Sequence, residues 1–180
     1  GVRRHQTLLD AVLRRFLKSP VRSVPATARE ALRCGTYDLL FNERVPAPAV
    51  VSDTVKLMGR DRRLRGLVNA VLRRVASSFV LIEAQGTPRD RHHVPVGDGR
   101  VARFEQAILP DIVADPVRSH AVRYSLTEFF VDAMMKQLPT EHEALFQACG
   151  RRMPMALRPV RGNTLELLQK QILDAGSRPG

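Results

Sequence analysis

Apolar residues recur at helical spacing along the first 80 positions. One stripe runs from Leu8 to Leu17, and Ser19-Pro20 ends it. A second segment, Ala26 to Phe41, is apolar on two sides, which is typical of a helix at the centre of a bundle. A third helix is predicted from about Ala49 to Met58. The pattern therefore predicts a helical bundle over this part of the chain.

Two small residues in the second segment carry specific predictions. Gly35 is unfavourable in a helix interior by about 1 kcal/mol, which indicates that a neighbouring helix approaches closely there. Cys34 is predicted to be a small core residue rather than a nucleophile, because free cysteine usually behaves as a buried apolar residue.

The stretch RGLVNAVLRR, residues 65–74, predicts a fourth helix with two different faces. Placing residues at 100° intervals collects one apolar stripe, which comprises Leu64, Leu67, Val68, Val71, Leu72 and Val75. The same geometry places a polar set on the opposite face, namely Arg62, Arg65, Asn69 and Arg73. This helix is expected to have both a core side and a cationic side.

Beyond residue 80 the pattern changes to turns and shorter elements. A hairpin is predicted around Gly97-Asp98-Gly99. Helices are predicted up to Leu138, capped by Ser125 or Thr127, and from Glu141 to Cys149. A short strand over 153–160 and a last helix, capped by Asn163 or Thr164 and running to Ile172, would follow.

The predicted fold class is mainly α: a helical bundle, a linker with a hairpin, and the incomplete start of an α/β subdomain of the ferredoxin or RRM kind. The corresponding domains are 1–80, 81–123 and 124–180.

The charge of the 180-residue chain is +11 and is unevenly placed. The first 80 residues hold 16 Lys and Arg against 6 Asp and Glu, and Arg greatly outnumbers Lys. Such a basic domain most often meets nucleic acid or an anionic membrane, and the planar guanidinium suits phosphate. A basic surface without an anionic partner remains the alternative.

Other classes of function lack support in the sequence. No apolar run is long enough to span a bilayer, and no signal peptide opens the chain, so no membrane partner is predicted. Cys34 and Cys149 lack metal-type spacing, and His92-His93 resembles a solvated loop, so no metal is predicted. Cytoplasmic residence with reduced thiols is expected, and a monomer is favoured.

The order of segments resembles known families. ALRCGTYDLLFNERVPAPAVVSDTVKLM, residues 31–58, followed by RGLVNAVLRR, resembles the NusB-type RNA-binding helical domain. Residues 94–116, 123–138 and 155–176 are similar to the linker and first substrate-side subdomain of RsmB-type (Sun/Fmu) methyltransferases. That family makes 5-methylcytosine in small-subunit ribosomal RNA. The resemblance implies a piece of a longer protein whose first helices precede Gly1.

The same resemblance limits the chemistry expected of this chain. Cytosine-C5 methylation needs a thiolate, a general base and bound S-adenosylmethionine, which the family supplies from a domain with a glycine-rich loop and a Pro-Cys motif. This chain has neither feature. The substrate-side strand of the family also reads Leu-Arg-Val-Asn, whereas this chain has Leu157-Arg158-Pro159-Val160. No catalytic, cofactor-binding or metal residue is therefore assigned, and the chain alone is expected to be inactive as an enzyme.

The favoured function is the RNA-binding portion of an S-adenosylmethionine-dependent rRNA cytosine-C5 methyltransferase, which positions small-subunit rRNA. The alternative is a stand-alone NusB-like RNA-binding protein of transcription antitermination, and a third is a basic scaffold that binds only proteins. The candidate RNA contacts are Arg62, Arg63, Arg65, Asn69, Arg73 and Arg74, extended by Arg3, Arg4, Arg14 and Arg15.

Overall fold

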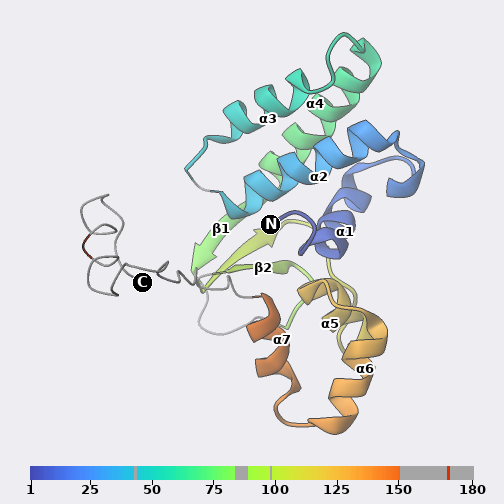
Figure 1. Ribbon diagram of the computed structural model, residues 1–180, viewed down its shortest axis with the longest axis vertical. Coiled ribbons are helices and arrows are strands. Elements are labelled where there is room, and N and C mark those ends of the chain that lie inside the picture. Colours follow the sequence, from blue (N-terminus) through green and yellow to red (C-terminus); the bar gives the residue numbers. More distant parts are fainter. Residues whose placement is uncertain (43, 84–88, 98, 151–169, 171–180) are drawn as a thin grey trace, which may run out of the picture. The chain divides into compact units, whose positions relative to one another are not determined.

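The computed structural model describes residues 1–42, 44–83, 89–97, 99–150 and 170. Residues 1–150 form one compact unit, and residues 151–180 form a second unit in which only Lys170 is described. The described part of the first unit contains seven α-helices and one three-stranded antiparallel sheet (Figure 1). The prediction of a mainly α fold with a helical bundle is thereby confirmed.

Four helices form the bundle: α1 (Gln6–Phe16), α2 (Ala26–Phe41), α3 (Ala47–Lys56) and α4 (Arg62–Ser77). Helix α2 packs against the other three, as its broad apolar surface predicted. Helix α3 begins two residues before the predicted start, with Pro48 in its first turn. Proline is tolerated there because its missing N–H would have no intrahelical partner in any case.

Gly35 lies where α2 meets both α3 and α4. A Cβ atom at this position would lie 2.6 Å from Cδ1 of Leu72 on α4 and 3.0 Å from Oγ1 of Thr54 on α3. The prediction of a close helix approach is confirmed. The core prediction for Cys34 is wrong, because this side chain is exposed. The arc of α2 that its neighbours cover includes the polar residues Arg33 and Thr36 and leaves Cys34 on the open side.

The sheet consists of β1 (Phe79–Glu83), β2 (His93–Gly97) and β3 (Arg100–Phe104), in the order β1-β3-β2. Strands β2 and β3 form the predicted hairpin, with a register shift between Pro95 and Gly97. Pro95 is tolerated because β2 is an edge strand. Strand β1 was not predicted: it is a short apolar run directly after α4, and such a run does not reveal its period.

Buried residues of the hairpin and of the segment after it belong to the same core as the bundle. These residues are Val94, Val96, Ala102, Phe104, Ile108 and Leu109. The core therefore continues across residue 80. The three-part division at residues 80 and 123 stays a prediction.

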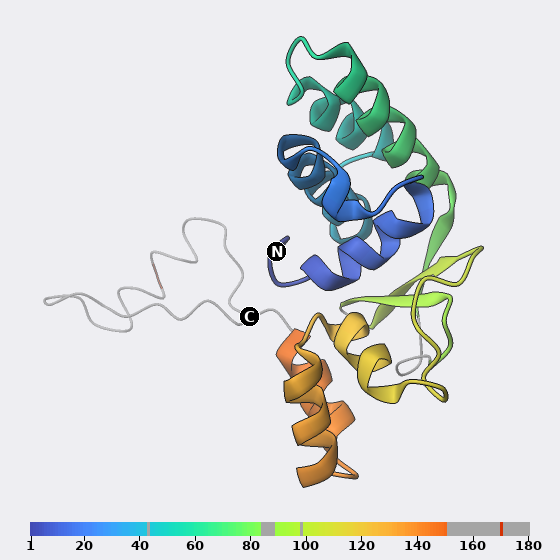
Figure 2. The same ribbon diagram turned by 90° about the vertical axis from the view of Figure 1, so that its right-hand side faces the viewer.

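Three further helices complete the described unit: α5 (Pro116–Tyr124), α6 (Glu128–Gln137) and α7 (His142–Gly150). Their order along the chain can be followed in Figure 2. Helices α6 and α7 confirm the predictions for this region, and Thr127 caps α6 by accepting a hydrogen bond from the Phe130 amide at 3.3 Å.

Helix α5 was missed because most of what it buries is polar or amphipathic. Ser119, His120 and Arg123 are buried on it together with Ala121 and Tyr124. A search for apolar spacing does not count such residues. The predicted strand over 153–160 and the helix ending at 172 lie outside the described residues, Lys170 apart. The α/β subdomain therefore stays a prediction.

Candidate functional site

Helix α4 concentrates positive charge. It carries five arginines and no acidic residue, and Asp61 caps its first turn by accepting from the Leu64 amide at 3.0 Å. Arg62, Arg63 and Arg65 lie in or next to the first turn, where the helix dipole is positive, so each is unfavourable by about 0.3–1 kcal/mol. Helix stability therefore does not explain why these three residues are basic.

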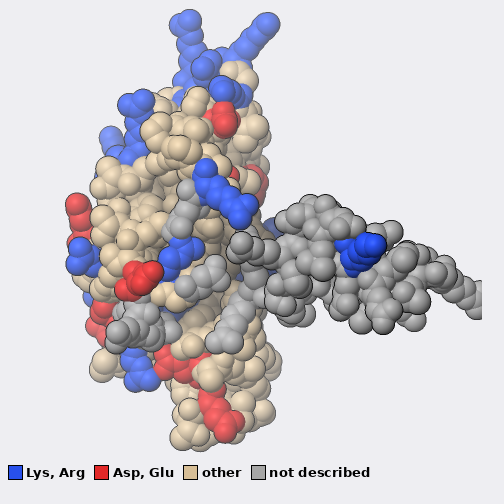
Figure 3. Space-filling model, turned by 90° about the vertical axis from the view of Figure 1, so that its left-hand side faces the viewer, with Lys and Arg blue, Asp and Glu red and all other residues tan. Residues whose placement is uncertain are grey.

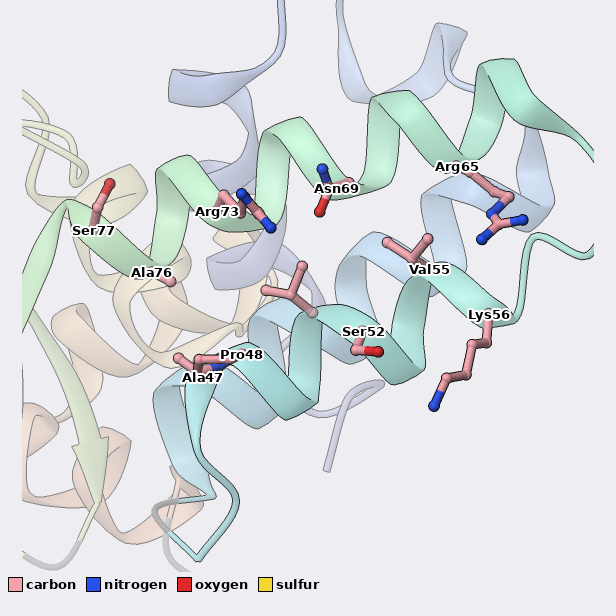
Figure 4. Close-up of a pocket in the computed structure, with 11 residues that line it drawn as sticks. Ala47, Pro48, Ser52, Val55, Lys56, Arg65, Asn69, Arg73, Ala76 and Ser77 are labelled. Atoms are coloured by element: carbon pink, nitrogen blue, oxygen red, sulfur yellow. The ribbon is translucent and has the colours of Figure 1, made fainter.

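A groove of about 600 Å³ lies between α3 and α4. Figure 4 shows the two helices running in opposite directions along it, with Arg65 directed toward the end of α3 that carries Lys56. From α3 the groove is lined by Ala47, Pro48, Val51, Ser52, Val55 and Lys56. From α4 it is lined by Arg65, Asn69, Arg73, Ala76 and Ser77.

The groove combines apolar and cationic groups without a carboxylate in its lining. Arg65 and Arg73 are exposed, Asn69 is half-buried, and within the described residues neither arginine takes part in an ion pair. Lys56 on the opposite wall pairs with Asp53 at 2.7 Å, and both side chains are 70% exposed. Such an exposed pair contributes little energy and leaves the ammonium accessible.

The structure thus brings three of the predicted site residues, Arg65, Asn69 and Arg73, together in one groove. Arg62 and Arg63 are exposed at the start of α4, outside the groove lining. Figure 3 shows Lys and Arg side chains projecting from the end of the bundle that holds the α3–α4 connection.

Arg74 lies on another side of α4, toward α1. Its Nη1 donates to the Phe16 carbonyl oxygen at 3.2 Å, and its guanidinium carbon lies 5.8 Å from the Phe16 ring centroid. The remaining predicted contacts are exposed and outside the groove lining: Arg14 and Arg15 in the last turn of α1, and Arg3 and Arg4 before it.

Sequence reasoning missed Lys56 and Ser52. Lys56 is the last residue of α3 and has no periodic partner on its own helix that would single it out. Its relevance comes from its position opposite α4, which only the packing of the two helices establishes.

One basic residue of the bundle has a structural task instead. The Arg33 guanidinium donates to both carboxylate oxygens of Asp10, at 2.8 and 2.6 Å, and to Glu30 at 2.7 Å. The hydrogen bond to Asp10 raises the pKa of Arg33 above its ordinary value. This pair ties α2 to α1 and is unavailable for an external anion.

Cys34 does not have the properties of an activated thiol. Partial desolvation by neighbouring atoms raises its pKa although the side chain is exposed, and the charges of Asp38 and Glu30 raise it further. A raised pKa disfavours the nucleophilic thiolate.

The two adjacent histidines have partners within the chain. His93 Nδ1 lies 2.5 Å from Oδ2 of Asp90, and His92 Nδ1 lies 3.2 Å from the Phe104 carbonyl oxygen. Groups of three or more potential metal ligands do not occur among the described residues. Within the same part of the chain, no helix has the length and apolar character needed to cross a membrane.

Comparison with known proteins finds similarity over the bundle. Residues 1–77 match the NusB family. The transcription antitermination protein NusB of Bradyrhizobium sp. (strain ORS 278) is 39% identical over 83 residues, which are 44% of this chain and 49% of that protein. The protein of the same name from Xylella fastidiosa (strain M12) is 33% identical over 88 residues, 48% of this chain and 56% of that protein.

The similarity covers only part of this chain and only part of each relative. The NusB of Bradyrhizobium diazoefficiens is 36% identical over 83 residues, which are 44% of this chain and 50% of that protein. The chain thus spans about half the length of the curated relatives it matches. No solved structure matches the chain. These matches indicate a NusB-family domain in the first 77 residues.

Proposed function

We propose that the NusB-family domain of this chain binds RNA through the groove between α3 and α4. The observation that carries the proposal is the pair Arg65 and Arg73, exposed and without ion pairs among the described residues, in a groove whose lining contains no carboxylate. Guanidinium groups bind phosphate oxygens in a planar, two-pronged geometry. The groove therefore offers two sites for backbone phosphates.

The spacing of these groups supports contact with an extended polyanion. Arg65 and Arg73 are eight residues apart, which corresponds to about 12 Å along the helix axis. Asn69 lies midway on the same wall, and its amide can both donate to and accept from a base edge. The two arginines would hold the backbone, and Asn69 would face the bases between them.

The names of the matched relatives support a regulatory role. Each of those proteins is a transcription antitermination protein. We therefore favour an RNA-binding protein of the NusB kind, acting in the regulation of transcription, over an enzyme.

A second candidate is the RNA-binding portion of an rRNA cytosine-C5 methyltransferase that uses S-adenosylmethionine. One observation favours it: beyond the NusB-family match, the described residues up to Leu109 share the core of the bundle, and helices α5 to α7 follow. The resemblance of residues 94–116 and 123–138 to the linker and substrate-side subdomain adds to this support. A reading frame that continues into a glycine-rich loop and a Pro-Cys motif would decide for the methyltransferase.

The test of RNA binding removes the two groove arginines from the full chain. The variant Arg65→Gln/Arg73→Gln is titrated with a small-subunit rRNA transcript between about 50 and 200 mM salt, where phosphate contacts dominate affinity. The logarithm of the binding constant falls linearly as the logarithm of the salt concentration rises. Loss of two phosphate contacts should make this line less steep by about 1.4–1.8.

The matched control is Arg103→Gln/Arg118→Gln, which removes the same charge from exposed positions on β3 and α5. This control should retain the slope of the unaltered chain. Equal slopes for the groove variant and the unaltered chain would refute the groove as the binding site. Absence of binding by the unaltered chain at about 50 mM salt would refute RNA binding itself and favour a scaffold that binds proteins.

A further inference from the structure

We propose that the bound RNA crosses α4, from the α3–α4 groove to the C-terminal end of α1, rather than following the groove alone. This inference rests on the proposed function and extends the surface that carries it. The additional contacts are the α1-end cations, Arg14, Arg15 and Lys18, all of which are exposed.

The sequence contains two basic stretches that lack acidic residues. Between Asp10 and Glu30 there are five Lys and Arg and no Asp or Glu. Between Asp61 and Glu83 there are again five basic residues, all arginine, and no acidic residue. A polyanion that meets either stretch encounters no carboxylate from it.

The fold brings these two stretches into contact although they are far apart in sequence. Arg74 of the second stretch donates to the carbonyl oxygen of Phe16 in the first at 3.2 Å, and its guanidinium lies 5.8 Å from the Phe16 ring centroid. Figure 2 shows the end of α1 beside the C-terminal half of α4. The cationic end of α1 is therefore next to α4.

Arg73 and Arg74 lie where the α3–α4 groove meets the surface of the α1-end cations. Consecutive helical residues point about 100° apart. Accordingly, Arg73 lines the groove with α3, whereas Arg74 reaches toward α1. Both side chains are exposed. A strand that leaves the groove at Arg73 therefore meets Arg74 and the α1-end cations after crossing one helix, whose width is about 10–12 Å with side chains.

Helix stabilisation explains only part of the charge at this end of α1. Arg14 and Arg15 lie in the last turn, where the helix dipole favours cations. Lys18 follows the C-cap residue Leu17, and within the described residues Arg14, Arg15 and Lys18 take part in no ion pair. Arg74 also donates a hydrogen bond to the carbonyl oxygen of Phe16, the last residue of α1. The paired carbonyl oxygen repels a phosphate less than an unpaired one would.

The test compares three double variants of the full chain, each of which loses two positive charges. They are the α1-end variant Arg15→Gln/Lys18→Gln, the groove variant Arg65→Gln/Arg73→Gln and the control Arg103→Gln/Arg118→Gln. Arg74 is left in place because its removal would also remove the hydrogen bond to Phe16. All six altered side chains are exposed, so the melting temperature should change by no more than about 4 °C in each variant, the size of a helix-dipole effect at Arg15 or Arg65.

Each variant is titrated with the same small-subunit rRNA transcript over the salt series. If RNA crosses α4, the α1-end and groove variants should each bind roughly 25- to 60-fold more weakly at about 0.1 M salt, while the control binds normally. An α1-end variant that matches the control, beside a weakened groove variant, overturns the crossing and leaves the proposed function intact. A groove variant that matches the control overturns both.

Discussion

Substituting Gly35 by Ala tests whether the close approach of α2 to its neighbours holds the groove helices in place. The added Cβ would lie 2.6 Å from Cδ1 and 3.1 Å from Cδ2 of Leu72, so exchanging the two methyl groups gives no relief. Leu72 is fully buried, and the third neighbour, Thr54 Oγ1, is held by its 2.7 Å hydrogen bond to the Val50 carbonyl. The new methyl group must therefore push α2 away from α4.

The magnitude follows from two opposing effects. Alanine is favoured over glycine in a helix by about 1 kcal/mol. Overpacking of a close-packed core costs about 1–3 kcal/mol. The net expectation is a loss of about 1 kcal/mol in the free energy of unfolding.

Gly66 provides a matched control on α4. It is also helical, but nothing lies within 4 Å of a Cβ added there. Gly66→Ala should therefore stabilise the protein by up to about 1 kcal/mol through helix propensity alone. The two alanine variants should differ by about 2 kcal/mol, although they carry the same chemical change.

The assay is urea unfolding followed by circular dichroism at the helical minimum, together with thermal melts. At about 2–4 °C per kcal/mol for a chain of this size, the melting temperatures of the two variants should differ by about 4–8 °C. A Gly35→Ala protein as stable as the Gly66→Ala protein would refute the argument from close approach.

Three further predictions concern other contacts. Asp10→Ala should destabilise the protein by about 2 kcal/mol in urea unfolding, because it removes the two charged hydrogen bonds that Arg33 makes to that carboxylate. Asp61→Ala should cost about 1 kcal/mol through loss of the hydrogen bond to the Leu64 amide, while Asp61→Asn retains the cap; a loss as large in the Asn variant would contradict this. Burial lowers the pKa of His120 below its ordinary value of 6.5, so unfolding takes up a proton and stability should decrease as pH falls below about 6.5. His120→Phe should reduce that decrease in a series of melts at different pH, and the part due to His5, whose pKa burial lowers to about 4, should persist.

The helices that form the groove could be predicted from the sequence. Periodic apolar residues identified α1 to α4, and the 100° spacing placed Arg65, Asn69 and Arg73 on one face of α4. Gly35 indicated a close contact because glycine destabilises a helix interior, and a close approach of a neighbouring helix explains its presence there. These features follow from local sequence, since helix period and residue volume are properties of a single segment.

Elements that bury polar side chains, or that consist of only a few residues, could not be predicted. Helix α5 buries His120 and Arg123, and β1 is a five-residue run. The exposure of Cys34 likewise depends on which neighbours surround α2, not on the apolar character of the residue. In each case the deciding interaction comes from a distant part of the chain.

By itself, the sequence determined that this chain has a basic helical bundle with a cationic face on α4. Only the tertiary structure decided how that face is divided. It placed Lys56 in one groove with Arg65 and Arg73, across from Arg65, and directed Arg74 to the end of α1 (Figure 4). The physical reason is that periodicity defines the angular position of a side chain on its own helix, whereas the packing of helices determines which element lies opposite.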